Sequence, residues 1–274
     1  MTGVGAGVLT GIAGCTSGES DSQTGPPPNA TTPPSDSVVE ALHFTGPDLV
    51  VRLAEDHDVT RLNLITPEGA TFEATRVAQG ATEARLRLIS KAGKTYSAGQ
   101  YELIAIAEPA SESIPIELQP AVQVVEVRPE VDEEGYSTGR LVVSVTNTGT
   151  GPTWVYNIGF RNAPYRNAPA VIDGNASVDT TFAKPAPDEE FLPPETTRDF
   201  LKRRGVLVVG DNDGVSCEGA STELTVVVQT PHGDVVQPVR AQLSGGVYID
   251  DPGALQHPCR DVRVELLEGG DTSE

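Results

Sequence analysis

Short runs of β-branched and other apolar residues, each bounded by turn residues, recur from Ser37 onward and constrain the fold of this chain most. Seven such runs fall within residues 38–118, a density of short strands that is typical of an antiparallel β-sandwich. Residues 49–53 and 84–89 alternate apolar and polar side chains, as strands that bury one face do. Only residues 195–204, which begin after two prolines, are compatible with one or two helical turns. We therefore predict an all-β fold.

The same pattern continues beyond Pro120 and predicts a second sandwich. Residues 138–160 are expected to form a strand, a turn at Asn-Thr-Gly and another strand. Residues 222–246 predict a hairpin, because apolar alternation flanks the turn residues Pro-His-Gly-Asp. A last strand is expected at residues 259–268.

Three segments of these regions resemble known immunoglobulin-like modules. The stretch before Tyr101, Ser-Ala-Gly-Gln, is similar to a tyrosine corner, in which the tyrosine bonds back to the preceding turn; the alternative is an ordinary strand tyrosine. Residues 138–160 resemble the CARDB-type and related adhesion modules of archaeal and bacterial surface proteins, through a V-x-V-x-N-x-G strand end followed by an aromatic strand. Residues 191–200 resemble their L-x-P-G-E-T segment, with Pro194 in place of the glycine. The resemblance implies two immunoglobulin-like antiparallel β-sandwich domains.

The N-terminal segment contains features that predict where in the cell the protein is located. Residues 3–14 are small and apolar, with the length of a signal-peptide core but not of a membrane span. They end in Ile-Ala-Gly-Cys15, which resembles a lipobox, and the whole string resembles the second half of the twin-arginine signals of haloarchaeal lipoproteins. The resemblance implies cleavage before Cys15, a lipid on its thiol, and an Arg-Arg pair upstream of Met1. The alternative is a glycine-rich N-terminus with an incidental cysteine.

After Cys15, serine, threonine, proline, glycine and acidic residues dominate, which predicts a disordered tether. Asn29 and Asn175 each begin a glycosylation sequon. The organisation that we expect is, in chain order, a signal-peptide remnant at 1–14, a lipidated linker at 15–36, a β-sandwich at 37–119, a second β-sandwich with long loops at 120–269, and an acidic tail at 270–274.

The charge composition limits the classes of partner that the protein can bind. Asp and Glu number 39 against 19 Lys and Arg, so the formal net charge is −20, and such a surface repels nucleic acid. Only four of the basic residues are lysines. Excess carboxylate with scarce lysine resembles the proteins of salt-loving archaea, and an ordinary acidic protein is the alternative.

The remaining cysteines form an even pair. With Cys15 assigned to lipid in a protein outside the cytoplasm, Cys217 and Cys259 are predicted to form a disulfide. Two free buried thiols are the alternative. The neighbouring residues do not match the ligand spacing of a metal site.

Two weak candidate sites remain. Trp154 and Tyr156 are expected to face the same side of a strand, either in the core or, with Tyr165, as a stacking surface for a sugar ring. Residues 210–219 begin like a calcium loop, so a weak cation site would use Asp211, Asp213 and Glu218; a turn rich in Asp and Asn is the alternative.

The sequence contains no G-x-S-x-G motif of hydrolases, no H-E-x-x-H motif of zinc proteases and no glycine-rich phosphate-binding loop. We expect a non-catalytic protein without a cofactor, anchored by lipid on the extracytoplasmic face of the membrane, that serves adhesion, envelope assembly or attachment to a partner. Its expected partners are the membrane, through the lipid on Cys15, and another envelope protein or a glycan. The alternative is a small-solute or glycan receptor associated with a transporter, and an enzyme ranks third.

Overall fold

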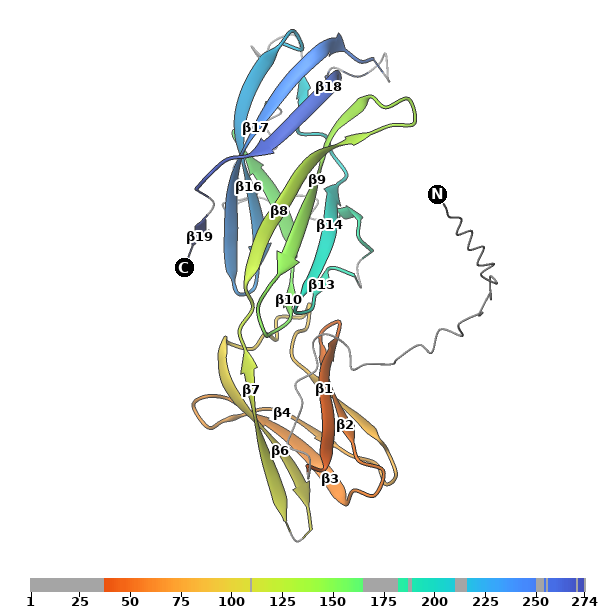
Figure 1. Ribbon diagram of the computed structural model, residues 1–274, viewed down its shortest axis with the longest axis vertical. Helices are drawn as coiled ribbons and strands as arrows, with labels where there is room; N and C mark the ends of the chain where they lie inside the picture. The colour runs from red at the N-terminus through yellow and green to blue at the C-terminus, as the bar shows by residue number, and fades with distance from the viewer. Residues whose placement is uncertain are drawn as a thin grey trace, which may run out of the picture.

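The computed structural model describes residues 37–108, 110–164, 182–186, 189–209, 216–249, 254, 256–269 and 271–273. These residues form antiparallel strands and no helix, which confirms the all-β, sandwich-type fold. No helix able to cross a membrane therefore occurs in the described ranges. Figure 1 shows the sheets in two groups that follow one another along the long axis.

The first group, here the first sandwich, pairs two sheets in the order β1-β2-β5 and β4-β3-β6-β7. Buried side chains of both sheets, such as Leu42 and Leu86 on one and Leu62 and Leu103 on the other, share one core. Its strands are β1 (Val39–Thr45), β2 (Asp48–Leu53), β3 (Val59–Ile65), β4 (Thr71–Arg76), β5 (Glu83–Arg87), β6 (Gly99–Ala107) and β7 (Ser111–Leu118).

Tyr101 forms the predicted tyrosine corner at the start of β6. Its hydroxyl donates to the carbonyl oxygen of Ser97 at 3.0 Å and accepts from the Ser97 N–H at 3.2 Å. Its ring is buried and meets Phe72 edge-on, with centroids 6.0 Å apart. The interpretation as a corner is therefore confirmed.

The second group, the second sandwich, pairs a sheet of order β12-β14-β9-β8 with one of order β11-β16-β17-β18-β15, to which β19 is added beside β17. A short β10-β13 ladder lies beside them. The strands are β8 (Val122–Val131), β9 (Ser137–Asn147), β10 (Thr153–Trp154), β11 (Asn157–Arg161), β12 (Phe182–Lys184), β13 (Phe191–Leu192), β14 (Thr196–Lys202), β15 (Val208–Val209), β16 (Ala220–Thr230), β17 (Gly233–Val247), β18 (His257–Leu266) and β19 (Asp271–Ser273).

The expectation of helical turns at residues 195–204 is wrong, because β14 occupies most of this range. It pairs with β9 from Thr196 opposite Asn147 to Leu201 opposite Val142. The β-branched threonines favour a strand, and Phe200 enters the core at 1% exposure.

Cys217 and Cys259 are joined in a disulfide, as predicted, across 42 positions of sequence. Cys217 precedes β16 and Cys259 lies in β18, and both are buried in the core of the second sandwich. The bond ties the C-terminal strand to the start of the hairpin β16-β17.

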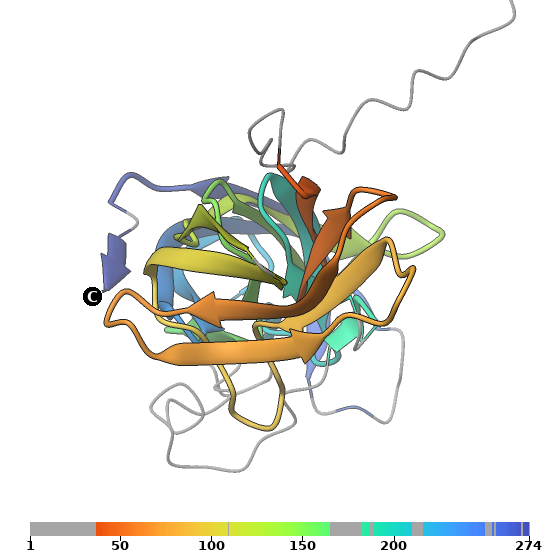
Figure 2. The same cartoon turned by 90° about the horizontal axis from the view of Figure 1, so that it is seen from below.

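The two sandwiches are arranged end to end. β7 leads directly into β8, so residues 111–131 run from one end of the molecule towards the other (Figure 1), roughly 65 Å at the rise of an extended strand. Viewed along the long axis, the first sandwich lies in front of the second (Figure 2). The N–H of Val38 bonds Glu112 Oε2 at 2.9 Å, so the described chain begins beside the start of β7, at the end we call the proximal pole. Val131, at the other end of β8, marks the distal pole.

Candidate functional site

The first feature of interest is the joint between the sandwiches, formed by residues 119–121 and 147–153 together with Tyr96 and His232. The segment 119–121, which links β7 to β8, is held by backbone hydrogen bonds. The Thr150 N–H donates to the Gln119 carbonyl at 2.8 Å, and the Thr148 N–H donates to the Ala121 carbonyl at 2.8 Å. A Cβ at Gly149 would clash with the Gln119 carbonyl oxygen. Glycine is therefore required for this close approach.

Asn147 holds the joint together from inside. Its side chain is fully buried, and its amide nitrogen donates to the carbonyl oxygens of Gly151 at 2.8 Å and Leu192 at 3.0 Å. Its amide oxygen accepts from the N–H groups of Ala121 and Gly149, both at 3.1 Å. Asn147 is the asparagine of the V-x-V-x-N-x-G segment. Its four hydrogen bonds require a side chain with an acceptor oxygen and two N–H donors, which an amide provides.

His232, at the tip of the hairpin β16-β17, bridges to the first sandwich. Its Nε2 lies 3.2 Å from the carbonyl oxygen of Tyr96 and its Nδ1 lies 2.9 Å from Thr153 Oγ1. A carbonyl only accepts, so Nε2 carries the proton and Nδ1 accepts from the threonine hydroxyl. Burial lowers the pKa of His232 to about 4, although the bond to Tyr96 opposes this. The neutral imidazole is therefore the form that fits the joint.

The Tyr96 phenol completes the contact. It is 2% exposed and donates to the carbonyl oxygen of Pro152 at 2.7 Å. Its ring centroid lies 4.6 Å from that of His232, and burial raises the pKa of the phenol, as does the nearby Tyr101. The phenol stays protonated and donates.

Trp154 and Tyr156 lie together, as the alternation predicted, with ring centroids 5.7 Å apart. The indole packs against the core of the first sandwich, its Nε1–H donates to Glu190 at 3.2 Å, and Lys91 Nζ lies 5.4 Å from its centroid. Tyr156 is 36% exposed, and burial, with the nearby Asp234, raises the pKa of its phenol. These contacts favour the packing role for Trp154.

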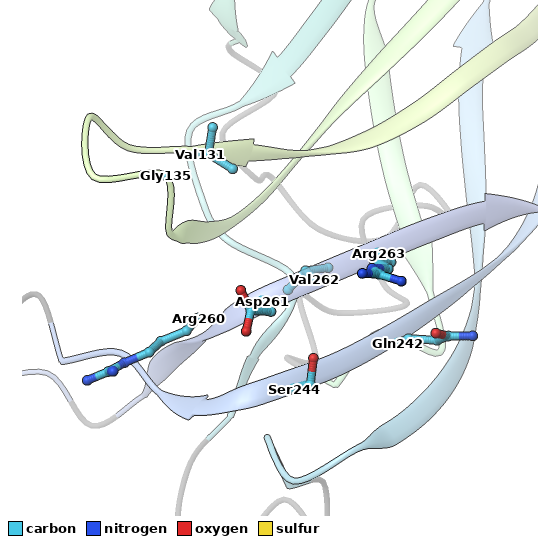
Figure 3. A pocket seen from close by; sticks show the side chains of 8 residues that line it. All are labelled: Val131, Gly135, Gln242, Ser244, Arg260, Asp261, Val262 and Arg263. Atoms are coloured by element: carbon cyan, nitrogen blue, oxygen red, sulfur yellow. The ribbon is translucent and has the colours of Figure 1, made fainter.

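The second feature is a hollow of about 510 Å³ at the distal pole. Figure 3 shows the β8-β9 hairpin on one side of it, and β17 and β18 on the other. The lining residues are Val131, Gly135, Gln242, Ser244, Arg260, Asp261, Val262 and Arg263.

Charged and apolar side chains are combined around this hollow. Arg260 lies over the Tyr136 ring at 5.5 Å, and Tyr136 in turn stacks against Tyr248 with centroids 4.9 Å apart. Val131 at the hollow is 54% exposed, and Ile249, which follows Tyr248 in the chain, is 59% exposed. A combination of arginine, half-buried tyrosine and exposed aliphatic groups is typical of the centre of a protein interface.

Several predicted site residues lie outside the described residues, namely Cys15, Asn29, Tyr165, Asn175, Asp211 and Asp213. Glu218 is described and is exposed. Across the described residues, no group of three or more His, Cys, Asp or Glu side chains is placed to hold a metal ion.

No protein-family model and no curated protein matches this chain. Function is therefore inferred from the geometry of the joint and of the hollow. Sequence reasoning did not identify either feature: it placed the domain boundary at residue 120 and interpreted Asn-Thr-Gly only as a turn within the second sandwich.

Proposed function

We propose that this chain is a non-catalytic, lipid-anchored protein of the extracytoplasmic face of a haloarchaeal membrane, which presents an attachment site to another component of the envelope. In this proposal the lipid is on Cys15, the sandwiches act as a spacer, and the distal pole meets the partner.

The observation that carries the proposal is the pole-to-pole arrangement. The described chain begins at the proximal pole, where Val38 bonds Glu112, and the hollow lies at the distal pole beside Val131. Between them, the second sandwich bonds the linking segment through Asn147, at Ala121, and bonds the first sandwich through His232, at Tyr96. A rigid connection fixes the distance between the hollow and the proximal pole, to which the predicted tether from Cys15 leads, whereas a flexible connection would not.

The anchor and the attachment are tested separately in a haloarchaeal host. Wild-type protein should be in the membrane fraction and should be removed by protease from intact cells, and Cys15→Ser should be in the medium. Retention of Cys15→Ser on membranes would contradict the anchor.

For attachment, cells that carry Val131→Asp or Ile249→Asp should lose at least half of the adhesion or envelope phenotype of the wild type. Val125→Asp is the matched control, because Val125 is also an exposed valine of β8, at 42%. A gene deletion that changes solute uptake but leaves adhesion and the envelope intact would favour the receptor alternative.

A further inference from the structure

Residues of β8 and β18 line the distal hollow, and both strands have backbone groups that no described strand pairs with. β8 is the terminal strand of its sheet. β18 pairs with β17 on one side, and β15 reaches only Pro258 and His257 on the other. Among the described strands, none therefore pairs with the second edge of residues 260–266. The N–H and C=O groups of such an edge are a template for an added strand.

The charge of the hollow is opposite to that of the chain. In a protein of net charge −20, the described lining contains two arginines and one carboxylate, that of Asp261. The neighbouring Arg240 of β17 is paired with Glu223 and Glu265, both at 2.8 Å. Arg263 has no ion pair within the described residues. A guanidinium binds a carboxylate through two parallel hydrogen bonds, so Arg263 is suited to an acidic ligand.

We propose that the hollow binds an extended acidic segment of a partner protein, which pairs with the open edge of β18 and places a carboxylate against Arg263. This inference rests on the proposed function and specifies the chemistry of the partner. The open edge offers backbone groups that a peptide matches and a glycan does not. The nearby rings of Tyr136 and Tyr248 are engaged with each other and with Arg260, which also favours a peptide over a stacked sugar.

Apolar side chains of the segment would be covered at the same time. Side chains of an extended peptide alternate between two faces. If the acidic residues face Arg263, the residues between them therefore lie on the opposite face of the peptide. Val131, across the hollow, is 54% exposed and offers an apolar contact. A segment that alternates valine and glutamate meets both requirements.

The test uses the full chain and three fluorescein-labelled peptides: TVEVEVT, its glutamine counterpart TVQVQVT, and TVEVEVT with both its valines and its glutamates N-methylated. Binding is measured by fluorescence anisotropy at the lowest KCl concentration at which circular dichroism shows the chain folded. TVEVEVT should bind at least tenfold more tightly than TVQVQVT, because a carboxylate is required. N-methylation should weaken binding at least tenfold, because it removes the backbone donors that pair with an edge.

Arg263→Gln should weaken the binding of TVEVEVT at least fivefold and should leave the weak binding of TVQVQVT unchanged. Arg85→Gln is the control, because Arg85 is an exposed arginine of β5 in the first sandwich, and it should have no effect. Equal binding of the acidic and glutamine peptides, equal losses in the two variants, or no binding of TVEVEVT would overturn the proposal. So would binding of oligogalacturonate in place of the peptide, which would make the ligand an acidic glycan.

These outcomes are separable from those of the proposed function. If Val131→Asp abolishes attachment on cells while TVEVEVT does not bind, the attachment function stands and the acidic segment is wrong. If Cys15→Ser stays on membranes while TVEVEVT binds, the anchor is wrong and the peptide site stands.

Discussion

The imidazole of His232 lies 3.2 Å, through Nε2, from the carbonyl oxygen of Tyr96, although the two residues are 136 positions apart. This bond joins the tip of a hairpin in the second sandwich to the first sandwich. It requires the proton on Nε2 and an acceptor lone pair on Nδ1, to which the Thr153 hydroxyl donates at 2.9 Å. The joint therefore depends on one protonation state.

Stability should consequently depend on pH through His232. Burial lowers its pKa from an ordinary 6.5 to about 4, so between these values the unfolded chain binds the extra proton. The contribution is then fully present above pH 6.5 and is lost as the pH falls towards 4, about 3 kcal/mol in all. Tyr96, the titratable group in contact, stays neutral throughout, because burial raises its pKa.

Chemical denaturation from pH 7.5 to 4 measures this dependence. His232→Gln removes the titrating group and should reduce the slope of unfolding free energy against pH. An unchanged slope in the variant would assign the pH dependence to other groups.

Asn147→Ala should destabilise the joint by about 2–4 kcal/mol, since it leaves the carbonyls of Gly151 and Leu192 and the N–H of Ala121 without their partner. Thr148→Ala is the control in the same turn, because its hydroxyl makes only an exposed bond to Ala121 at 3.3 Å. We expect a change below about 0.5 kcal/mol for that control. Amide hydrogen exchange at Gln119 and Ala121 measures the loosening, and equal protection in both variants would contradict it.

Tyr101→Phe should destabilise the first sandwich by about 1 kcal/mol, because it removes the hydroxyl that bonds both backbone groups of Ser97. Tyr156→Phe is the matched control at a site that is 36% exposed and should be close to neutral. The difference is read from urea unfolding curves followed by circular dichroism. Equal effects of the two substitutions would contradict a stabilising role for the corner.

Replacement of Cys217 and Cys259 by serine should cost about 4 kcal/mol in the chain-entropy model, because the bond spans 42 positions. The loss should fall on the second sandwich, whose core contains both cysteines. Non-reducing peptide mapping should find the two cysteine peptides linked, and free thiols at both positions would contradict the bond. Calorimetry with and without a reductant then measures its contribution.

Local pattern was sufficient for the strands and for the corner of the first sandwich, because alternation and turn residues act over a few positions. It was insufficient at residues 195–204, where pairing of Thr196 with Asn147 of β9 decides the conformation. Local pattern could not predict the joint for the same reason, because His232 contacts Tyr96 only after both sandwiches have formed. The hollow lies between the β8-β9 hairpin and β18, which belong to different sheets (Figure 3). The sequence of either strand alone does not show which strand will lie opposite it.

The full chain should be stabilised by salt. It carries 39 acidic against 19 basic residues, so its unscreened carboxylates repel one another in the compact state. The screening length falls from about 10 Å at 0.1 M salt to about 3 Å at 1 M. We expect the melting temperature to rise by at least about 10 °C between 0.1 and 2 M KCl, with NaCl giving the same rise and sucrose of equal osmolality a much smaller one. A melting temperature that is independent of KCl would make the composition that of an ordinary acidic protein and would remove the halophilic part of the proposed function.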